Sequence, residues 1–164
     1  MKILYIIRHA KSSWKFPELS DHDRPLNKRG KRDAPEIGKR LQRQGVSPDT
    51  LISSTANRAY TTAQKIAAEI RFPSSEVVPS SDLFHADPSE ILEVIQGVSD
   101  EYHSAMIFGH NPGITWAANQ LGNLNIDNIP TCGVVAISFS VNRWSELGFG
   151  KGALMFYDYP KRII

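Results

Sequence analysis

The sequence predicts an α/β fold, a three-layer α/β/α sandwich with a mostly parallel central sheet. Short runs rich in apolar and β-branched residues alternate with stretches of helical periodicity, and this alternation is typical of such folds. The first run, Ile3–Ile7, is apolar throughout, as expected of a strand buried on both faces of a sheet. The 164 residues contain no repeat, low-complexity tract or linker, so we expect one domain over residues 1–164.

The first half of the chain has the pattern of two strands, each followed by a helix. Asn27 is a suitable N-cap for the first helix, and Gly45 is a suitable stop. Pro35 lies inside that segment, where it either kinks the helix or begins a second one. The predicted elements are a strand at 3–7, a helix from Asn27 towards Gln44, a strand at 51–52, and a helix from Thr55 or Asn57 to Ile70.

The second half continues the alternation and adds two strands at its end. The segment Asp87–Glu90 combines a cap acceptor, a proline at the first helical position and a glutamate that reaches back to the cap. The predicted elements are a strand at 77–78, a helix after Asp87 that buries Ile91, Leu92 and Ile95, a strand at 105–108, a helix from Pro112 to Leu121 closed by Gly122, and strands at 134–141 and 153–157, the last at an edge.

Composition limits the partners and the compartment of the protein. The net charge of +2 argues against nucleic acid as a partner, and we interpret the basic stretch Lys28–Arg43 as a solvated helix face. No apolar stretch of the sequence is long enough to cross a membrane, so we expect no membrane partner. Cys132 is the single cysteine and cannot form an intramolecular disulfide, so we expect a structural residue in a cytoplasmic protein.

Charged and polar side chains follow the predicted strands where those strands end. Arg8 and His9 come directly after the first strand, and His110 follows the strand at 105–108. The carboxyl ends of parallel strands meet at one edge of a sheet, where ligands bind, so His9 and His110 can converge there. Arg58 lies at the start of a helix, where free backbone N–H groups favour an anion, and Arg24 precedes another helix.

This set of residue types suits a phosphoryl group. Guanidinium groups match phosphate oxygens in a bidentate way, so two or three arginines can neutralise the group without a metal ion. A histidine beside them can attack phosphorus. The spacing of His, Cys and Asp does not resemble a zinc site. Taken singly, each residue also has a structural interpretation: His9 as a hydrogen-bonded core histidine, Arg8 as an ion-pair partner, His110 as a helix cap, Arg58 as an exposed arginine, and Arg24 as a partner of Asp21 or Asp23.

Four short motifs, taken in order, resemble the histidine phosphatase superfamily, and most closely its small SixA-type phosphohistidine phosphatase branch. The motifs are Ile7–Ser12 (IRHAKS), Asp23–Leu26 (DRPL), Ser53–Ala59 (SSTANRA) with Thr62-Ala63, and Phe108–Pro112 (FGHNP). The resemblance implies a phosphoglycerate-mutase-like fold with no metal or organic cofactor. It further implies that His9 becomes transiently phosphorylated, that Arg8, Arg58 and His110 hold the phosphoryl oxygens, and that Arg24 joins them.

The sequence departs from the family pattern at two points. Ala10 stands where much of the superfamily has glycine, and its methyl group narrows the approach to the phosphate. Larger members carry an acid on an inserted segment, which protonates the leaving group, and this chain has no room for that segment. The acid is then Asp82, His85 or absent. The imidazole of a phosphohistidine leaves readily because its pKa is about 6.5, so a weak or absent acid fits an N–P substrate.

We therefore expect a metal-independent phosphatase that hydrolyses a phosphorylated protein side chain, and phosphohistidine in particular, through a covalent intermediate on His9. We expect a backbone carbonyl to hold the other ring nitrogen of His9, which would fix the tautomer. A shallow pocket, expected without insertions, suits a protein surface better than a small sugar phosphate. The alternatives are a small-molecule phosphomonoesterase and a module that binds phosphate without turnover. The sequence leaves the oligomeric state open.

Overall fold

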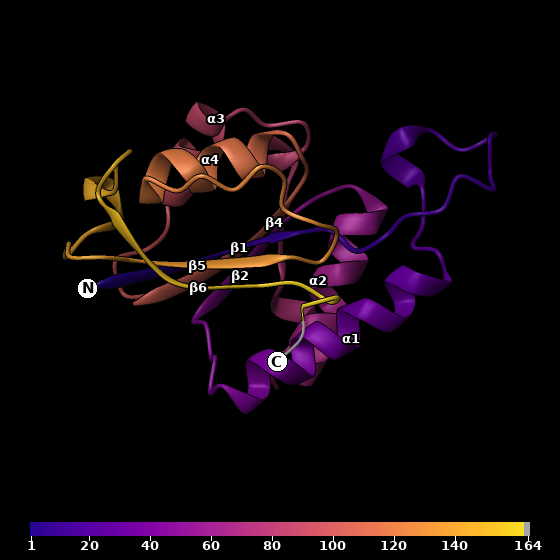
Figure 1. Cartoon of the computed structure of the whole chain (residues 1–164), viewed down its shortest axis with the longest axis horizontal. Coiled ribbons are helices and arrows are strands. Elements are labelled where there is room, and N and C mark those ends of the chain that lie inside the picture. Colours follow the sequence, from indigo (N-terminus) through magenta and orange to yellow (C-terminus); the bar gives the residue numbers. More distant parts are fainter. Residues whose placement is uncertain (163–164) are drawn as a thin grey trace.

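The computed structural model describes residues 1–162, and in it a six-stranded sheet has helices on both faces (Figure 1). This arrangement confirms the predicted three-layer α/β/α sandwich. The strands are β1 (Lys2–Arg8), β2 (Thr50–Ser54), β3 (Val78–Ser80), β4 (Ser104–Gly109), β5 (Val134–Phe139) and β6 (Gly152–Asp158). The α-helices are α1 (Lys28–Arg43), α2 (Asn57–Glu69), α3 (Pro88–Gln96) and α4 (Gly113–Gly122).

The sheet is mostly parallel, as predicted. Its strand order is β3-β2-β4-β1-β5-β6. The strands β3, β2, β4 and β1 run parallel, whereas β5 is antiparallel to β1 and β6 is antiparallel to β5. The last strand, β6, lies at an edge, which the sequence also predicted. The carboxyl ends of β1, β2 and β4 therefore lie side by side at one edge of the sheet.

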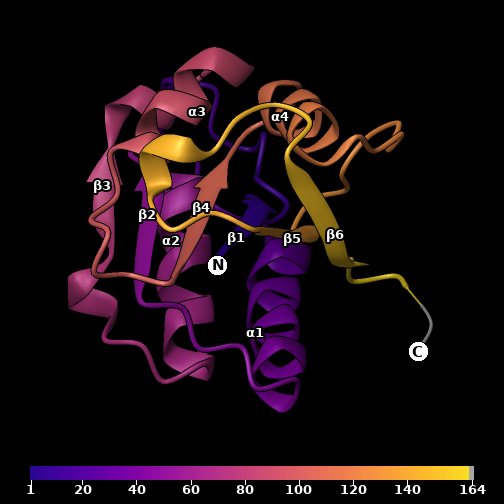
Figure 2. The same cartoon turned by 90° about the vertical axis from the view of Figure 1, so that its left-hand side faces the viewer.

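Strand β1 is buried on both faces because its side chains alternate between two apolar cores. Tyr5 and Ile7 pack into the core beneath α1 and α2, and Leu4 and Ile6 pack into the core beneath α3 and α4. Figure 2 shows the two helix pairs on opposite sides of the sheet. Burial of apolar surface is the main favourable contribution to folding, so β1 is firmly anchored and the residues at its end are held in place.

Two of the predicted helix starts are confirmed in detail. The side chain of Asn27 accepts a hydrogen bond from the Gly30 backbone N–H at 2.9 Å, so α1 begins where the sequence placed it. Pro35 lies inside α1, which continues through it, and no second helix begins there. Asp87 and Glu90 form both hydrogen bonds of the predicted capping box of α3.

Two helix ends differ from the prediction. The N-cap position of α2 is Ala56, so neither Thr55 nor Asn57 caps this helix. The Ala56 N–H instead donates to the Ser54 hydroxyl at 3.2 Å, which makes the last residue of β2 the polar partner of the turn. The helix α4 includes Gly122 and ends in the left-handed residue Asn123, whose φ is 51°, a conformation that asparagine tolerates well.

Two expectations drawn from composition can also be compared with the structure. Cys132 is fully buried, and burial raises the pKa of its thiol, which is the behaviour of an unreactive structural cysteine. Among the helices of residues 1–162, none has the length and apolar character needed to span a bilayer.

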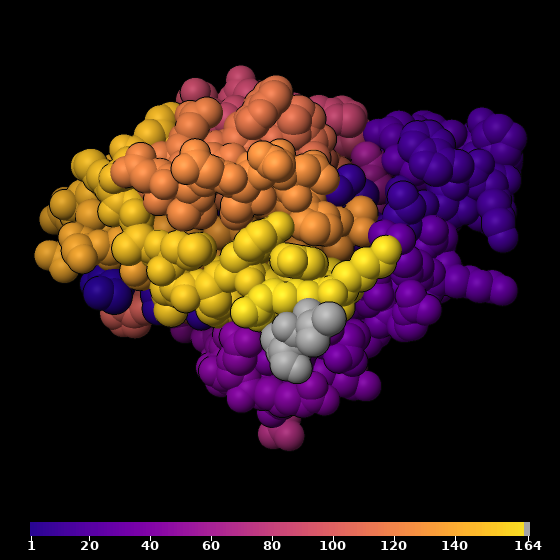
Figure 3. Space-filling model, in the orientation of Figure 1, coloured from indigo at the N-terminus to yellow at the C-terminus, as the bar shows by residue number. Residues whose placement is uncertain are grey.

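Figure 3 shows that the segment between β1 and α1 projects from one end of the molecule, beyond the edge where β1 ends.

Candidate active site

The register of the central strands brings the predicted site residues together. In the β1/β4 pair Arg8 lies opposite Gly109, so His9 and His110 each follow the last paired residue. In the β2/β4 pair Ser53 lies opposite Phe108, which brings the end of β2 to the same level. The rings of His9 and His110 consequently lie with their centroids 5.2 Å apart. The predicted convergence of the two histidines is therefore confirmed.

The two histidines line a cavity of about 210 Å³ at this edge of the sheet. The three arginines that the sequence singled out, Arg8, Arg24 and Arg58, line the same cavity. Asp82 does not line it and faces a separate hollow beside Glu90 and Glu93. The other residues that line the cavity are Lys11, Ser12, Trp14, His85, Asn111 and Thr131.

The backbone around His9 fixes the state of its ring. The His9 side chain is buried, and its Nδ1 lies 2.7 Å from the carbonyl oxygen of Ala10. A carbonyl oxygen only accepts hydrogen bonds, so Nδ1 carries the proton and Nε2 keeps its lone pair. The Ala10 N–H donates to the Thr62 hydroxyl at 2.9 Å, and that hydroxyl donates to the Arg58 carbonyl at 2.7 Å. These two bonds fasten the turn that carries His9 to the first turns of α2.

Burial keeps His9 uncharged. It lowers the pKa of His9 to about 3; the hydrogen bond to Ala10 acts in the opposite direction, and the charges of Arg58, Arg8 and Arg24 lower the pKa further. A neutral ring with a bare Nε2 is the form in which histidine acts as a nucleophile. The cavity thus combines a neutral histidine with three arginine cations.

His110 has one occupied ring nitrogen and one free. Its Nε2 lies 2.8 Å from the Ser54 hydroxyl, and its buried Nδ1 has no hydrogen-bond partner. Burial is the main cause that lowers the pKa of His110 to about 2; the repulsion that a charged His110 would meet from Arg58 and from protonated His9 or His85 acts in the same direction, and the Asp21 carboxylate opposes it. The Ser54 hydroxyl oxygen accepts a hydrogen bond from the Ala56 N–H, and its proton is available to donate to His110 Nε2. In that arrangement the neutral His110 ring carries its proton on Nδ1.

Asp21 connects the arginines and was missed as a site residue by the sequence reasoning, which considered it only as a partner of Arg24. Its carboxylate accepts from Arg24 Nε at 3.1 Å and from Arg58 Nη2 at 3.1 Å, and it lies 3.5 Å from His85 Nε2. Burial alone would raise the pKa of Asp21, but the charges and hydrogen bonds of Arg58 and Arg24 outweigh it and lower the pKa. The two guanidinium groups are therefore already oriented towards an anion.

Other contacts hold the arginines at the cavity. Arg8 Nη1 donates to the Ile129 carbonyl at 3.0 Å, and Arg24 Nη1 donates to the Ser12 hydroxyl at 2.8 Å. The Arg24 guanidinium also lies 3.6 Å from the centre of the exposed Trp14 ring, a favourable cation–π contact. The Nε atoms of Arg8 and Arg58 are buried without a hydrogen-bond partner. Cations with unused N–H groups suit an oxyanion with several acceptor oxygens.

His85 reaches the site and Asp82 does not, which separates the two candidate acids. The backbone of His85 is left-handed, with φ 57°, a strained conformation for a residue other than glycine. Its ring lies against Phe84 with centroids 3.9 Å apart and planes tilted by 39°, and Phe84 in turn contacts the His110 ring edge-on with centroids 5.5 Å apart. The turn thus directs His85 into the cavity. Within residues 1–162, no three His, Cys, Asp or Glu side chains gather in a group able to hold a metal ion.

Comparison with known proteins agrees with this geometry. Residues 4–83 match the family model of the histidine phosphatase superfamily (branch 1). An uncharacterized chloroplastic protein of Arabidopsis thaliana is 32% identical over 151 residues, which make up 87% of this chain and 69% of the relative. The family match includes Arg8, His9, Arg24 and Arg58, and stops before His110.

Solved structures show the same fold. A proposed SixA phosphohistidine phosphatase from Agrobacterium tumefaciens superposes with a TM-score of 0.83 at 24% identity, covering 97% of this chain and 98% of its own. The protein histidine phosphatase SixA complexed with tungstate superposes with a TM-score of 0.81 at 19% identity, covering 96% and 97% of the two chains. The chain therefore belongs to the histidine phosphatase superfamily, and it has the phosphoglycerate-mutase-like fold of the SixA-type proteins.

Proposed function

We propose that this protein is a phosphatase that removes the phosphoryl group from phosphohistidine in a protein, through a covalent intermediate on His9. The observation that carries the proposal is the state of His9. Its ring is buried and neutral, its Nδ1 is engaged by the Ala10 carbonyl, and its bare Nε2 is surrounded by Arg8, Arg24 and Arg58. A nucleophile and an anion-binding cluster thus share one cavity.

The first step forms the phosphoenzyme. The lone pair of His9 Nε2 attacks phosphorus in line with the leaving group, a P–N bond forms to His9, and the P–N bond to the substrate imidazole breaks. The electron pair of the broken bond stays on the substrate nitrogen, which takes up a proton. The guanidinium groups of Arg8, Arg24 and Arg58 bind the phosphoryl oxygens and stabilise the charge that spreads over them. Binding of tungstate, a tetrahedral oxyanion, by a SixA protein supports this assignment.

The second step releases phosphate. Water attacks phosphorus, the P–Nε2 bond breaks, and inorganic phosphate leaves as His9 regains its lone pair. We infer that His110 donates a hydrogen bond from Nδ1 to a phosphoryl oxygen in both steps. Ser54 is a positioning residue in this scheme, because its hydroxyl bonds to Nε2 and sets the tautomer of His110.

His85 is our candidate for the group that gives the leaving nitrogen its proton. It lines the cavity, and its Nε2 lies 3.5 Å from the Asp21 carboxylate. An imidazole leaving group needs less help from an acid than an alkoxide does, so an exposed histidine is sufficient for an N–P bond. This difference underlies the proposed preference for phosphohistidine over a phosphate ester.

A protein is the proposed substrate because the cavity is small and one side is bordered by Trp14, a residue that is 74% exposed. An exposed aromatic side chain beside a reactive cavity suits contact with another protein surface. We further propose that the reaction needs no metal ion, because the arginines supply the positive charge that a metal would contribute. We expect the protein in the cytoplasm, where the single cysteine stays reduced.

Two peptides of one sequence, phosphorylated on histidine or on serine, test the proposal by their rates of phosphate release. We expect kcat/KM for the phosphohistidine peptide to be at least about tenfold higher, since a fully effective acid is worth about 100-fold or more to an ester substrate. His9→Ala should abolish release. His103→Ala, which changes an exposed histidine before β4, should have no effect.

Other outcomes would assign a different function. Equal or faster release from the phosphoserine peptide, or faster release from small phosphate esters, would make the protein a phosphomonoesterase. If the protein binds the phosphohistidine peptide through His9 but releases no phosphate, it is a recognition module. Both results would contradict the proposed reaction.

A further inference from the structure

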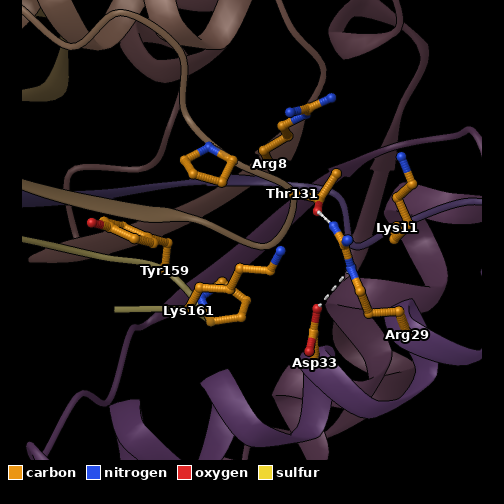
Figure 4. Close-up of a pocket in the computed structure, with 9 residues that line it drawn as sticks. Arg8, Lys11, Arg29, Asp33, Thr131, Tyr159 and Lys161 are labelled. Atoms are coloured by element: carbon orange, nitrogen blue, oxygen red, sulfur yellow. Dashed lines mark hydrogen bonds and ion pairs between the residues drawn. The ribbon is translucent and has the colours of Figure 1, made fainter. Parts of the chain in front are cut away.

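A second cleft, of about 300 Å³, adjoins the candidate active site. The cleft and the catalytic cavity share Arg8, Lys11 and Thr131, so the cleft opens directly beside the proposed phosphoryl position. Figure 4 shows Arg29, from the start of α1, and Lys161, from the segment after β6, reaching into this space from opposite sides. Neither residue has a part in the proposed reaction.

The charges that line the cleft favour an anion. Asp33 is the carboxylate among its lining residues, and its side chain is only 12% exposed. It already lies 3.6 Å from Arg29 Nε and 3.7 Å from Arg32 Nε, so its charge is matched. Four of the lining residues are cationic and one is anionic, so the cleft has an excess of positive charge although the net charge of the whole chain is only +2. The cationic lining residues are Arg8, Lys11, Arg29 and Lys161.

Arg29 is held in a fixed position before any ligand binds. Its Nη2 donates to the Thr131 hydroxyl at 3.1 Å, and its buried Nε has no hydrogen-bond partner but lies 3.6 Å from the Asp33 carboxylate in an ion pair (Figure 4). Thr131 also lines the catalytic cavity, so one hydrogen bond links the two sites. A guanidinium fixed in this way loses little freedom when it binds a carboxylate.

The remaining walls suit a polypeptide. Pro130, Tyr159 and Pro160 line the cleft with largely apolar surface. A peptide segment presents apolar and charged groups in alternation, and a cleft with apolar walls and cationic corners complements both kinds. A free inorganic anion would make no use of the apolar walls.

The cleft continues along α1. A neighbouring hollow of about 470 Å³ shares Arg29 and Lys161 with it and adds Arg32 and Lys39, together with one carboxylate, Glu36. The sequence predicted that Lys28–Arg43 forms a solvated helix face, and Arg32 and Lys39 are indeed exposed. The structure adds that this face borders a mainly basic surface that starts at the catalytic cavity.

We propose that this cleft binds acidic side chains that flank the phosphorylated residue of the protein substrate, with Arg29 and Lys161 as the specificity-determining cations. The inference rests on the proposed function, since it names the kind of protein that the phosphatase acts on. Carboxylates of the substrate would pair with Arg29 and Lys161 while the phosphoryl group lies against Arg8 and His9.

Two phosphohistidine peptides test the inference, identical except that three glutamates on one side of the phosphohistidine are replaced by glutamines. We expect the native protein to show kcat/KM about three- to tenfold higher for the acidic peptide, as expected for two partly exposed charge pairs. The double variant Arg29→Gln/Lys161→Gln should turn over both peptides equally. Its kcat/KM for the neutral peptide should match that of the native protein.

A matched control removes a lysine at the other end of β6 from the cleft. Lys151 is exposed beside the start of β6, so Lys151→Gln makes the same change of charge far from the cleft and should retain the preference. If the double variant fails to fold, Lys161→Glu alone should reverse the preference. A double variant that keeps the full preference for the acidic peptide would overturn the inference.

A binding measurement separates this inference from the proposed function. A fluorescent, non-phosphorylated acidic peptide should bind the native protein about three- to tenfold more tightly than the double variant, as followed by anisotropy. If neither phosphohistidine peptide is hydrolysed, the proposed function fails, and this measurement still decides the role of the cleft. Equal affinity of the acidic peptide for the native protein and the double variant would overturn that role. It would also be overturned if the native protein preferred small molecules with two anionic groups but showed no preference for the acidic peptide.

Discussion

At the scale of single residues, the proposed chemistry depends on histidines that stay neutral among arginines. A protonated His9 would have no lone pair for phosphorus, and burial is the main reason that the ring remains unprotonated. The Ala10 carbonyl then selects which nitrogen carries the proton. The same reasoning applies to His110, whose Nε2 contacts Ser54.

The ring signals of His9 and His110 in NMR spectra should therefore not titrate between pH 8 and 5. The pKa of His9 is lowered to about 3 and that of His110 to about 2, so both rings remain neutral throughout this range. Nitrogen chemical shifts should show both rings protonated on Nδ1. An inflection near pH 6.5 for either ring in the ligand-free protein would contradict the account.

The same shifts make stability depend on pH. An unfolded chain protonates its histidines below about pH 6.5, whereas the folded protein leaves His9 neutral down to about pH 3. The unfolded state binds more protons in this window, so stability falls as pH falls, by at most about 1.4 kcal/mol per unit for each ring. Urea denaturation should show that the free energy of unfolding decreases less from pH 7 to pH 5 for His9→Asn than for the native protein.

At the scale of elements, the first turn of α1 supports the turn that follows β1. The Asn27 N–H donates to the Lys11 carbonyl at 3.0 Å, and Gly30 lies against the same carbonyl so closely that a Cβ there would overlap it. Lys11 lies two residues after His9, so a shift of this turn would move the proposed nucleophile. The glycine is required by close approach of two backbones and not by its own φ.

Gly30→Ala should therefore lower both stability and turnover. The overlap must be relieved by moving α1 or the turn, and overpacking of this kind costs about 1–3 kcal/mol in the free energy of unfolding. Gly97→Ala is the matched control, because a Cβ there would meet the Val94 carbonyl at an ordinary 3.5 Å. We expect the control to stay within about 0.5 kcal/mol of the native protein in denaturation curves. A Gly30→Ala protein as stable and active as the control would refute this role.

At the scale of the whole molecule, the sequence predicted the layers and the meeting of strand ends. Arg8 and His9 follow one apolar run, and His110 follows a second. If the two strands are parallel, these residues must lie at the same edge of the sheet. The order of motifs then indicated Arg24 and Arg58. The structure places these residues around one cavity, the histidines because they follow parallel strands and the two arginines because their motifs lie beside that edge.

The features that escaped prediction depend on tertiary placement. The position of Asp21 between Arg24 and Arg58 arises from a short 3₁₀ turn, Asp21–Asp23, docked against α2. His85 was named from the sequence as a candidate acid, but its left-handed backbone, which accompanies its place at the cavity, had no sequence signal. The basic cleft combines residues near the two ends of the chain, and hydrophobic periodicity gives no information about such a pairing.

The central claim concerns the whole molecule, because sheet, turn and helix all contribute to the reactivity of His9. It is tested most directly by trapping the intermediate. The protein would be mixed with a phosphohistidine peptide labelled with radioactive phosphate and quenched in alkali, which preserves phosphohistidine. Mass spectrometry would then locate the label.

We predict a transient label on His9 that is absent from His9→Asn and retained in His103→Ala. Release of phosphate at an undiminished rate by His9→Asn, or turnover by the native protein with the label on a residue other than His9, would contradict the account.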